Sequence, residues 1–275
     1  MDILTINEQD IIRTISPNDE MNRRDKTVPD WYSYVGRSAL DAIETCLHVA
    51  RKPLSGVTRI LDFPCGHGRV LRYLKTAFPK AEITACDLLK DGVDFCAETF
   101  GAKPVYSHED PAQIGIASHT FDLIWVGSLF SHLSAERWSP FLTFFASCLR
   151  EDGLLVFTTS GRFVYRRMKG LEDSYDYYLP YWRKTVALYD YENKGFGYGE
   201  YGGKGYGISI SDPAWVCAFL AQQRDLRYVS FAERGWTDIQ DVYACVRSLH
   251  PRYSETATPL TLCLKHKIRE IWKPK

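Results

Sequence analysis

A run of seven residues, FDLIWVG at 121–127, is apolar on both of the faces that a strand presents. Such a strand must be covered on both sides, which is the condition of a central strand in a parallel sheet. Shorter apolar runs occur at 58–63, 81–87 and 154–160, and stretches with helical periodicity, such as 134–150, separate them. This alternation over roughly a hundred residues predicts an α/β fold with a doubly wound, mostly parallel sheet.

The regular alternation stops between residues 161 and 209. Ten tyrosines and nine glycines fall in this segment, and GFGYGEYGGKGYG at 195–207 is too rich in glycine for a helix interior. A segment of this kind is either a disordered loop or an ordered lid whose aromatic side chains pack on something. Because aromatic residues drive a chain to pack, we expect an ordered cap rather than a disordered insert.

Composition narrows the class of protein. The 34 basic and 34 acidic residues balance, which argues against a protein that binds nucleic acid through its phosphates. No apolar run approaches the roughly 18 residues of a transmembrane helix, and the first residues lack the basic and apolar parts of a secretory signal. The eight cysteines form no CxxC pair and no acid or histidine spacing suggests a metal, so we expect free thiols in the cytoplasm.

The strongest functional motif joins the first strand to the helix that follows it. Asp62 ends the strand and PCGHG comes next, so the bare backbone at Gly66 and Gly68 lies near a helix N-terminus and is open to a polar ligand. A dinucleotide fingerprint would need a third glycine where Leu71 stands, which disfavours a nicotinamide dehydrogenase. Asp87 ends the second strand about twenty residues past the loop, where an acid can accept both hydroxyls of a ribose.

Taken together, these motifs resemble class I S-adenosylmethionine-dependent methyltransferases. The resemblance rests on ILDFPCGHGR (60–69), TACD (84–87), EDP (109–111), FDLIWVGSLFSHL (121–133) and LREDGLLVFTTSGR (149–162). It covers about residues 58 to 247 and includes five parallel strands followed by two closing strands, of which the seventh is antiparallel. The chain departs from the family at Pro64, where the first glycine usually stands, so the turn must be of a type that accepts a proline.

A narrower resemblance is to bacterial methyltransferases that accompany glycosyltransferases in surface-polysaccharide or natural-product pathways. It rests on VGRSAL (35–40), YGISISDPAWV (206–216) and RGWTDIQDVY (234–243). This likeness favours a sugar or a related small molecule as the acceptor of the methyl group.

The family resemblance implies S-adenosylmethionine as the cofactor and assigns ten residues to it. Five would wrap its methionine half, two would pass beneath that half, and the last three would bind the ribose diol, cover the adenine and accept from the adenine amino group. In that order they are Asp62, Pro64, Cys65, Gly66, Gly68, Gly127, Ser128, Asp87, Leu88 and Asp110. Asp62 and Asp87 could instead be helix caps, and the glycines of the loop a plain tight turn.

The acceptor side is assigned by the same resemblance. His132 follows the fourth strand beside the expected sulfonium, so it would be a general base or hold the acceptor, although a residue that only packs the loop is the alternative. The loop between the last two strands would emerge at the active-site edge, unless it is an ordinary turn. The acceptor residues would come from this loop and from the cap: Tyr198, Tyr206, Arg234, Trp236 and Gln240.

The sequence therefore predicts a cytoplasmic enzyme that moves a methyl group from S-adenosylmethionine to oxygen of a small molecule. Residues 58–247 would form the methyltransferase domain, 1–57 an N-terminal helical lid segment and 248–275 a tail. The tail is basic and amphipathic and could touch an anionic membrane, but packing on its own domain is favoured. The alternatives are a nitrogen or carbon acceptor, or an inactive methyltransferase fold that binds a partner; the oligomeric state stays open.

Overall fold

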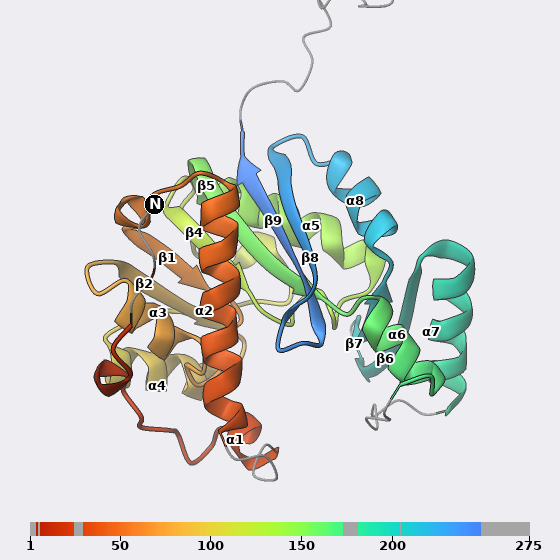
Figure 1. Cartoon of the computed structure of the whole chain (residues 1–275), viewed down its shortest axis with the longest axis horizontal. Helices are drawn as coiled ribbons and strands as arrows, with labels where there is room; N and C mark the ends of the chain where they lie inside the picture. The colour runs from red at the N-terminus through yellow and green to blue at the C-terminus, as the bar shows by residue number, and fades with distance from the viewer. Residues whose placement is uncertain (1–3, 5, 25–29, 173–180, 204, 249–275) are drawn as a thin grey trace, which may run out of the picture.

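A seven-stranded sheet forms the centre of the protein in the computed structural model, which describes residues 4, 6–24, 30–172, 181–203 and 205–248. The strand order is β3-β2-β1-β4-β5-β9-β8 (Figure 1). In that order the strands are Lys103–Tyr106, Glu82–Asp87, Arg59–Asp62, Phe121–Val126, Leu149–Thr159, Gln240–Arg247 and Leu226–Trp236. The first five are parallel and β9 is antiparallel to both of its neighbours, which confirms the predicted doubly wound sheet with its antiparallel seventh strand.

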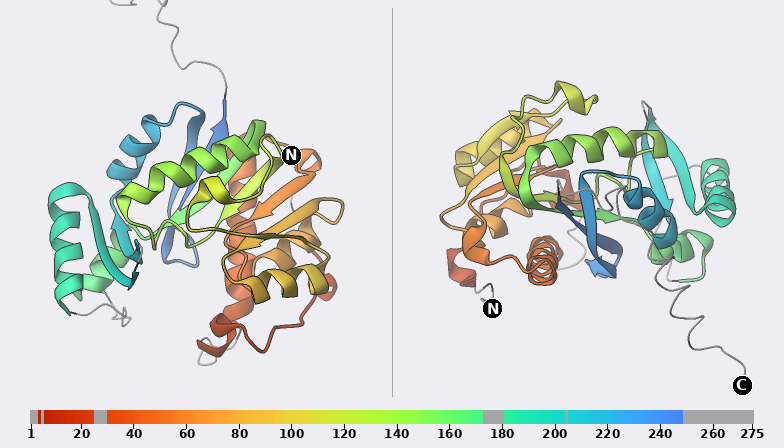
Figure 2. Two further views of the ribbon diagram at one scale, coloured as in Figure 1. Left: turned by 180° about the vertical axis from the view of Figure 1, so that it is seen from behind. Right: turned by 90° about the horizontal axis from the view of Figure 1, so that it is seen from above.

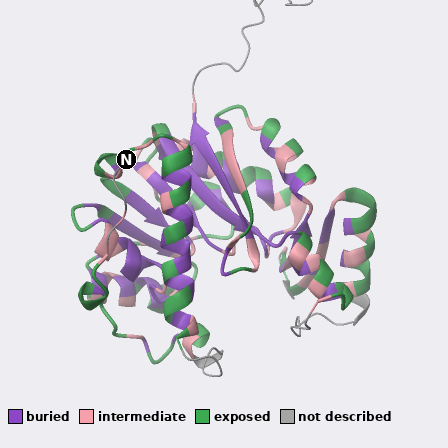
Figure 3. Cartoon of the chain, in the orientation of Figure 1, coloured by how far each residue is buried: buried purple, intermediate pink, exposed green. Residues whose placement is uncertain are grey.

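The central strand β4 shows why the sheet is covered on both faces. Leu123 and Trp125 belong to one hydrophobic cluster, whereas Ile124 and Val126 belong to the cluster on the opposite face. All four are at most 1% exposed, and β1, β2, β4, β5 and β9 are buried along most of their length, whereas the edge strands β3 and β8 are not (Figure 3). The apolar run at 121–127 is therefore buried by alternation into two cores, as a parallel sheet requires.

Helices cover the two faces of this sheet (Figure 2). One face carries α2 (Trp31–Val49), α3 (Leu71–Ala77) and α4 (Lys90–Phe100), and the other carries α5 (Ala135–Cys148) and α8 (Pro213–Ala221). Short helical segments also lie along the chain: η1 (Glu8–Asp10), α1 (Glu20–Arg24), η3 (Leu54–Gly56) and η4 (Pro111–Gln113). Although α2 falls within the predicted lid segment, its buried side chains form part of the main core.

The described residues between β5 and α8 form an ordered subdomain, which we call the cap. It contains α6 (Arg162–Lys169), α7 (Tyr181–Lys194) and an antiparallel hairpin of β6 (Phe196–Gly203) and β7 (Tyr206–Ser211). The glycine-rich sequence is thus a hairpin rather than an irregular loop. Close packing accounts for one of its glycines, because a Cβ at Gly197 would stand 1.8 Å from the carbonyl oxygen of Ala187 in α7.

The cap is joined to the main sheet through β7. The backbone N–H groups of Gly207, Ser209 and Ser211 donate to the carbonyl oxygens of His132, Ser131 and Ser160, at 2.8, 2.9 and 2.8 Å. The stretch that follows β4 therefore pairs with the cap hairpin like a short additional strand. Within the described residues, no helix has both the length and the apolar character needed to cross a membrane. The predicted C-terminal tail lies outside the described residues except for Ser248.

Candidate active site

A cavity of about 830 Å³ opens at the carboxyl ends of β1, β2 and β4. Its volume lies in the range of roughly 300–1,000 Å³ that is usual for sites of whole small ligands. The walls include residues 18–21, the loop after β1, the ends of β2 and β3, the stretch after β4, part of α5, and single residues of the cap and the last loop. This is the edge where open α/β sheets bind their ligands.

The loop after β1 brings bare backbone to the cavity. Gly66 and Gly68 have φ angles of +51° and +78°, in the left-handed region that glycine adopts without strain. A Cβ at Gly66 would meet nothing within 4 Å, whereas one at Gly68 would stand 2.5 Å from the ring of Phe100. Pro64, at the departure from the family pattern, follows a cis peptide bond and lines the cavity together with Cys65.

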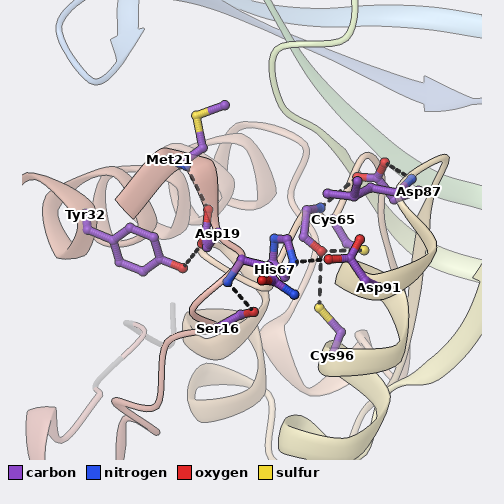
Figure 4. Close-up of polar contacts among 12 residues, drawn as sticks. Ser16, Asp19, Met21, Tyr32, Cys65, His67, Asp87, Asp91 and Cys96 are labelled. Carbon is purple, nitrogen blue, oxygen red and sulfur yellow. Dashed lines mark hydrogen bonds and ion pairs between the residues drawn. The ribbon is translucent and has the colours of Figure 1, made fainter. Parts of the chain in front are cut away.

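Asp87 fixes this loop from the neighbouring strand. Its Oδ2 accepts from the Gly66 N–H at 2.7 Å, and its Oδ1 accepts from the Leu89 N–H at 2.9 Å (Figure 4). Burial raises the pKa of this carboxyl above its usual value, while hydrogen bonds from the backbone act in the opposite direction. Leu88 beside it is 59% exposed and lines the cavity. The structure thus brings Asp87, Leu88 and the glycine loop together in the wall of one cavity.

Asp62 is the most unusual group in the cavity wall. Its side chain is 1% exposed, and within the described part of the chain neither carboxylate oxygen has a hydrogen-bond partner. Burial, and then the nearby charge of Asp87, raise its pKa well above the usual value. A buried acid without a donor is costly, so this position calls for a ligand that brings a donor or a positive charge.

His132 stands across the cavity on the stretch after β4. Its Nδ1 lies 2.8 Å from the Gly207 carbonyl oxygen and 3.2 Å from the Tyr201 hydroxyl. A carbonyl oxygen can only accept, so Nδ1 carries the proton and Nε2 keeps its lone pair. The ring stacks on Tyr206 with centroids 5.1 Å apart. Burial lowers the pKa of His132, with the Gly207 hydrogen bond opposing this, so the ring is neutral at pH 7.

Comparison with known proteins identifies the domain. A family described as "Methyltransferase domain" matches residues 60–153. The chain contains a class I methyltransferase domain. S-adenosylmethionine is the cofactor of such domains, which confirms the predicted family and cofactor.

A curated relative and two solved structures are also similar to the chain. The relative is a fatty-acid O-methyltransferase of Mycolicibacterium smegmatis, 28% identical over 130 residues, which are 47% of this chain and 42% of that protein. The chain thus matches less than half of the relative's length. Crystal structures of S-adenosylmethionine-dependent methyltransferases from Aquifex aeolicus and Clostridium acetobutylicum are 14% and 15% identical, with TM-scores of 0.50 and 0.52. They cover 85% and 84% of this chain, and 100% and 98% of their own chains are matched, so they share its fold.

Two of the predicted cofactor residues, Ser128 and Asp110, differ in their position relative to the cavity. Ser128 lines the cavity next to Gly127 and has a φ of +62°. Asp110 is exposed and caps η4, accepting from the Ala112 N–H at 3.0 Å and from the Gln113 side chain at 3.2 Å. The lining residues at this point are its neighbours His108 and Glu109. Asp110 therefore acts as a helix cap in this structure and does not line the cavity.

The five predicted acceptor residues separate into two groups. Tyr206 and Trp236 line the cavity, and the Trp236 indole N–H donates to the Val35 carbonyl at 3.0 Å. Arg234 instead places its guanidinium 4.0 Å above the Phe163 ring, at the base of the cap. Tyr198 is half-buried against the core beside α5, with a buried hydroxyl.

Gln240 does not line the cavity but supports Ser128, which does. Its Nε2 donates to the Ser128 hydroxyl at 2.9 Å, and its Oε1 accepts from the Thr158 hydroxyl at 2.6 Å. The Thr158 hydroxyl in turn accepts from the Ser128 N–H at 2.8 Å. This network holds Ser128 in its left-handed conformation, which is uncommon for a residue with a side chain.

Sequence reasoning missed part of the wall. Residues 18–21 line the cavity opposite the glycine loop, although no motif marks them. Gly92 was also missed: a Cβ there would stand 2.5 Å from the Gly66 carbonyl oxygen, so α4 can approach the loop only with glycine at this position. Within the described residues there is no group of acids, histidines and cysteines that could hold a metal ion.

Proposed function

We propose that the protein transfers the methyl group of S-adenosylmethionine to a hydroxyl oxygen of a small polar acceptor, such as a sugar. The observation that carries this proposal is His132, a neutral imidazole whose Nδ1 is protonated and whose ring lines the cavity. Its Nε2 keeps a lone pair and can act as a base, and His132 itself belongs to the stretch that follows β4. The narrower resemblance to methyltransferases of polysaccharide pathways supports a sugar as acceptor.

The acidic half of the cavity fits the proposed cofactor. S-adenosylmethionine supplies a methyl group on a positively charged sulfur, and it also carries an ammonium group and two ribose hydroxyls. Asp62 offers two buried oxygens without donors, which suits a cationic group. Asp87 uses one lone pair on each oxygen for the backbone and keeps others for the ribose hydroxyls. We assign Asp62, Gly66, Gly68 and Asp87 to cofactor binding on these grounds.

The chain's own contribution to the transfer is alignment, exclusion of water and removal of one proton. A hydroxyl acceptor must lose its proton as the new carbon–oxygen bond forms. His132 takes that proton on Nε2, while the Gly207 carbonyl stabilises the resulting cation through Nδ1–H. Tyr206 offers a flat aromatic face and a hydroxyl to the cavity, which suit a sugar ring held in line with the methyl group, while the buried Trp236 forms part of the wall.

The curated relative is a fatty-acid O-methyltransferase, so a carboxylate is the competing oxygen acceptor. A carboxylate at neutral pH has no proton to lose and gains little from a base. The oriented His132 therefore favours a hydroxyl over a carboxylate.

The seven described cysteines are all free, which agrees with the proposed cytoplasmic location.

The experiment is an acceptor screen with isotopically labelled S-adenosylmethionine. Nucleotide sugars and free sugars represent hydroxyl acceptors, a fatty acid represents carboxylates, and an amino sugar represents nitrogen. We expect S-adenosylhomocysteine and a labelled methyl ether with one of the hydroxyl acceptors. A labelled ester or amine as the sole product would refute the hydroxyl assignment. Binding of the cofactor without turnover, with all these acceptors and with cell extract, would favour the inactive partner-binding alternative.

A further inference from the structure

A buried arginine lies directly behind the glycine loop. Arg72 stands in the first turn of α3 and is 4% exposed. Its Nε donates to the Gly68 carbonyl oxygen at 3.1 Å, and its Nη1 donates to the Ile12 carbonyl oxygen at 3.0 Å. Its Nη2 donates to the Tyr32 hydroxyl at 3.3 Å. One guanidinium therefore joins the cofactor loop, the N-terminal segment and α2.

The chain of contacts continues from α2 to the cavity. The Tyr32 hydroxyl donates to Asp19 Oδ2 at 2.7 Å, and Asp19 Oδ1 accepts from the Met21 N–H at 2.9 Å (Figure 4). Asp19 is 3% exposed, and its N–H donates to the Ser16 carbonyl oxygen at 3.1 Å. Asp19 and Met21 both line the cavity, opposite the glycine loop.

We infer that Arg72 is a positioning residue that couples the glycine loop to the N-terminal segment 12–21 and so sets how that segment closes over the cofactor. The inference rests on the proposed function only in requiring that the cavity binds S-adenosylmethionine. Arg72 holds the Gly68 carbonyl, and the Tyr32–Asp19 link connects this contact to Met21, so a cofactor bound against Gly66 to Gly68 also stabilises the segment at Met21. Because the two equilibria are coupled, holding the segment in place strengthens cofactor binding by the same factor by which the bound cofactor stabilises the segment.

The geometry requires arginine at this position. Its three partners lie in three directions, and the planar guanidinium offers donors on three nitrogens, whereas a lysine ammonium offers donors at one point. The guanidinium carbon also lies 5.2 Å from the ring centroids of both Tyr32 and Phe100. These rings favour a delocalised cation in a dry site.

The test uses the full chain and the conservative variant Tyr32→Phe, which deletes only the hydroxyl that links Arg72 to Asp19. Affinity for S-adenosylhomocysteine is measured by calorimetry, and trypsin cleavage after Arg13 reports on the N-terminal segment. We expect affinity to fall about tenfold, the usual effect of one buried hydrogen bond, and the protection that S-adenosylhomocysteine gives against cleavage to be lost. The matched control is Tyr73→Phe, which removes a hydroxyl from another buried tyrosine close to Arg72 but outside the link.

A double variant separates coupling from simple loss of contacts. If the link acts as one unit, Tyr32→Phe combined with Asp19→Asn binds S-adenosylhomocysteine about as weakly as the weaker single variant. Additive losses, or unchanged affinity and protection in Tyr32→Phe, would overturn the inference. Wild-type protein that fails to bind S-adenosylhomocysteine would instead remove the proposed function. Arg72→Lys, checked for folding by thermal unfolding, should show the same loss of affinity as Tyr32→Phe.

Discussion

Replacing Asp62 by asparagine should stabilise the cofactor-free protein and weaken cofactor binding. An ionised buried carboxylate without a partner costs roughly 3–5 kcal/mol, and a neutral unsatisfied polar group costs about 1–3 kcal/mol. Both oxygens of Asp62 are in that condition at 1% exposure. The difference predicts that Asp62→Asn raises the free energy of unfolding at pH 8 by about 1–3 kcal/mol.

The pH dependence has a defined sign. The pKa of Asp62 is raised in the folded protein by burial and by the charge of Asp87, so its contribution to stability is lost as pH rises through that folded value. The advantage of the asparagine variant should therefore grow between pH 5 and pH 8. Urea unfolding of both proteins at several pH values measures it. Asp225→Asn, at an exposed acid, is the matched control and should change little.

The same substitution should act in the opposite direction on binding. Losing a hydrogen bond to a charged group costs about 1.5–3 kcal/mol, which corresponds to roughly 10- to 150-fold weaker affinity for S-adenosylhomocysteine. Calorimetry at pH 8 gives this number. Lower stability of Asp62→Asn than of wild type without cofactor would contradict the interpretation of Asp62 as an unpaired buried acid. Unchanged affinity for S-adenosylhomocysteine would contradict its role in binding a cationic group of the cofactor.

Three further predictions concern the base, the wall and the cap. His132→Ala should retain S-adenosylhomocysteine affinity and lose about 10²–10⁴ in turnover, whereas His48→Ala should not; a change within a few-fold would leave His132 a packing residue. In the wild type, kcat/KM should fall with decreasing pH through a pKa below the usual histidine value of 6.5, and this limb should vanish in His132→Ala. Gln240→Leu should lower the free energy of unfolding by about 1–3 kcal/mol, because it removes two hydrogen bonds under Ser128; an unchanged value, as expected for exposed Gln222→Leu, would contradict the network. Gly197→Ala should destabilise by about 1–3 kcal/mol because its Cβ would meet the Ala187 carbonyl, whereas Gly115→Ala, with open space around it, should be neutral in the same urea titration.

The parts of the site that follow from local sequence could be predicted well. Asp62 and the two loop glycines are neighbours in the chain, and the end of β2 must lie beside the end of β1 once the sheet is parallel, so Asp87 follows from topology alone. Asp110 shows the limit of this reasoning. Whether it or its neighbour Glu109 faces the cavity depends on the phase of an irregular loop, and no periodicity reports that phase.

The site residues that the sequence did not predict correctly are positioned by contacts between distant segments of the chain. Gln240 was expected at the acceptor, but its amide reaches Ser128 across β5, a meeting that depends on the register of β5 and β9. Residues 18–21 reach the cavity because Asp19 is held by Tyr32, and neither residue belongs to a motif. The fold was easier because each strand and helix carries its own apolar pattern, whereas these side-chain meetings are set by tertiary packing.

The pairing of β7 with the stretch after β4 makes the protonation of His132 a property of the main chain. Its Nδ1 donates to the Gly207 carbonyl while the Gly207 N–H donates to the His132 carbonyl, so a reciprocal pair of bonds fixes the ring. The acceptor is a backbone group, but position 207 still requires glycine, because a Cβ there would stand 2.2 Å from the Gly199 carbonyl oxygen in β6. Exchanging caps between related enzymes would transfer this orientation intact wherever the pairing register of β7 is kept, even with no side chain in common. A one-residue deletion in the hairpin would instead shift the pairing register, so that His132 Nδ1 would face a backbone N–H in place of a carbonyl oxygen. We expect such a deletion to abolish activity although no residue that lines the cavity is replaced.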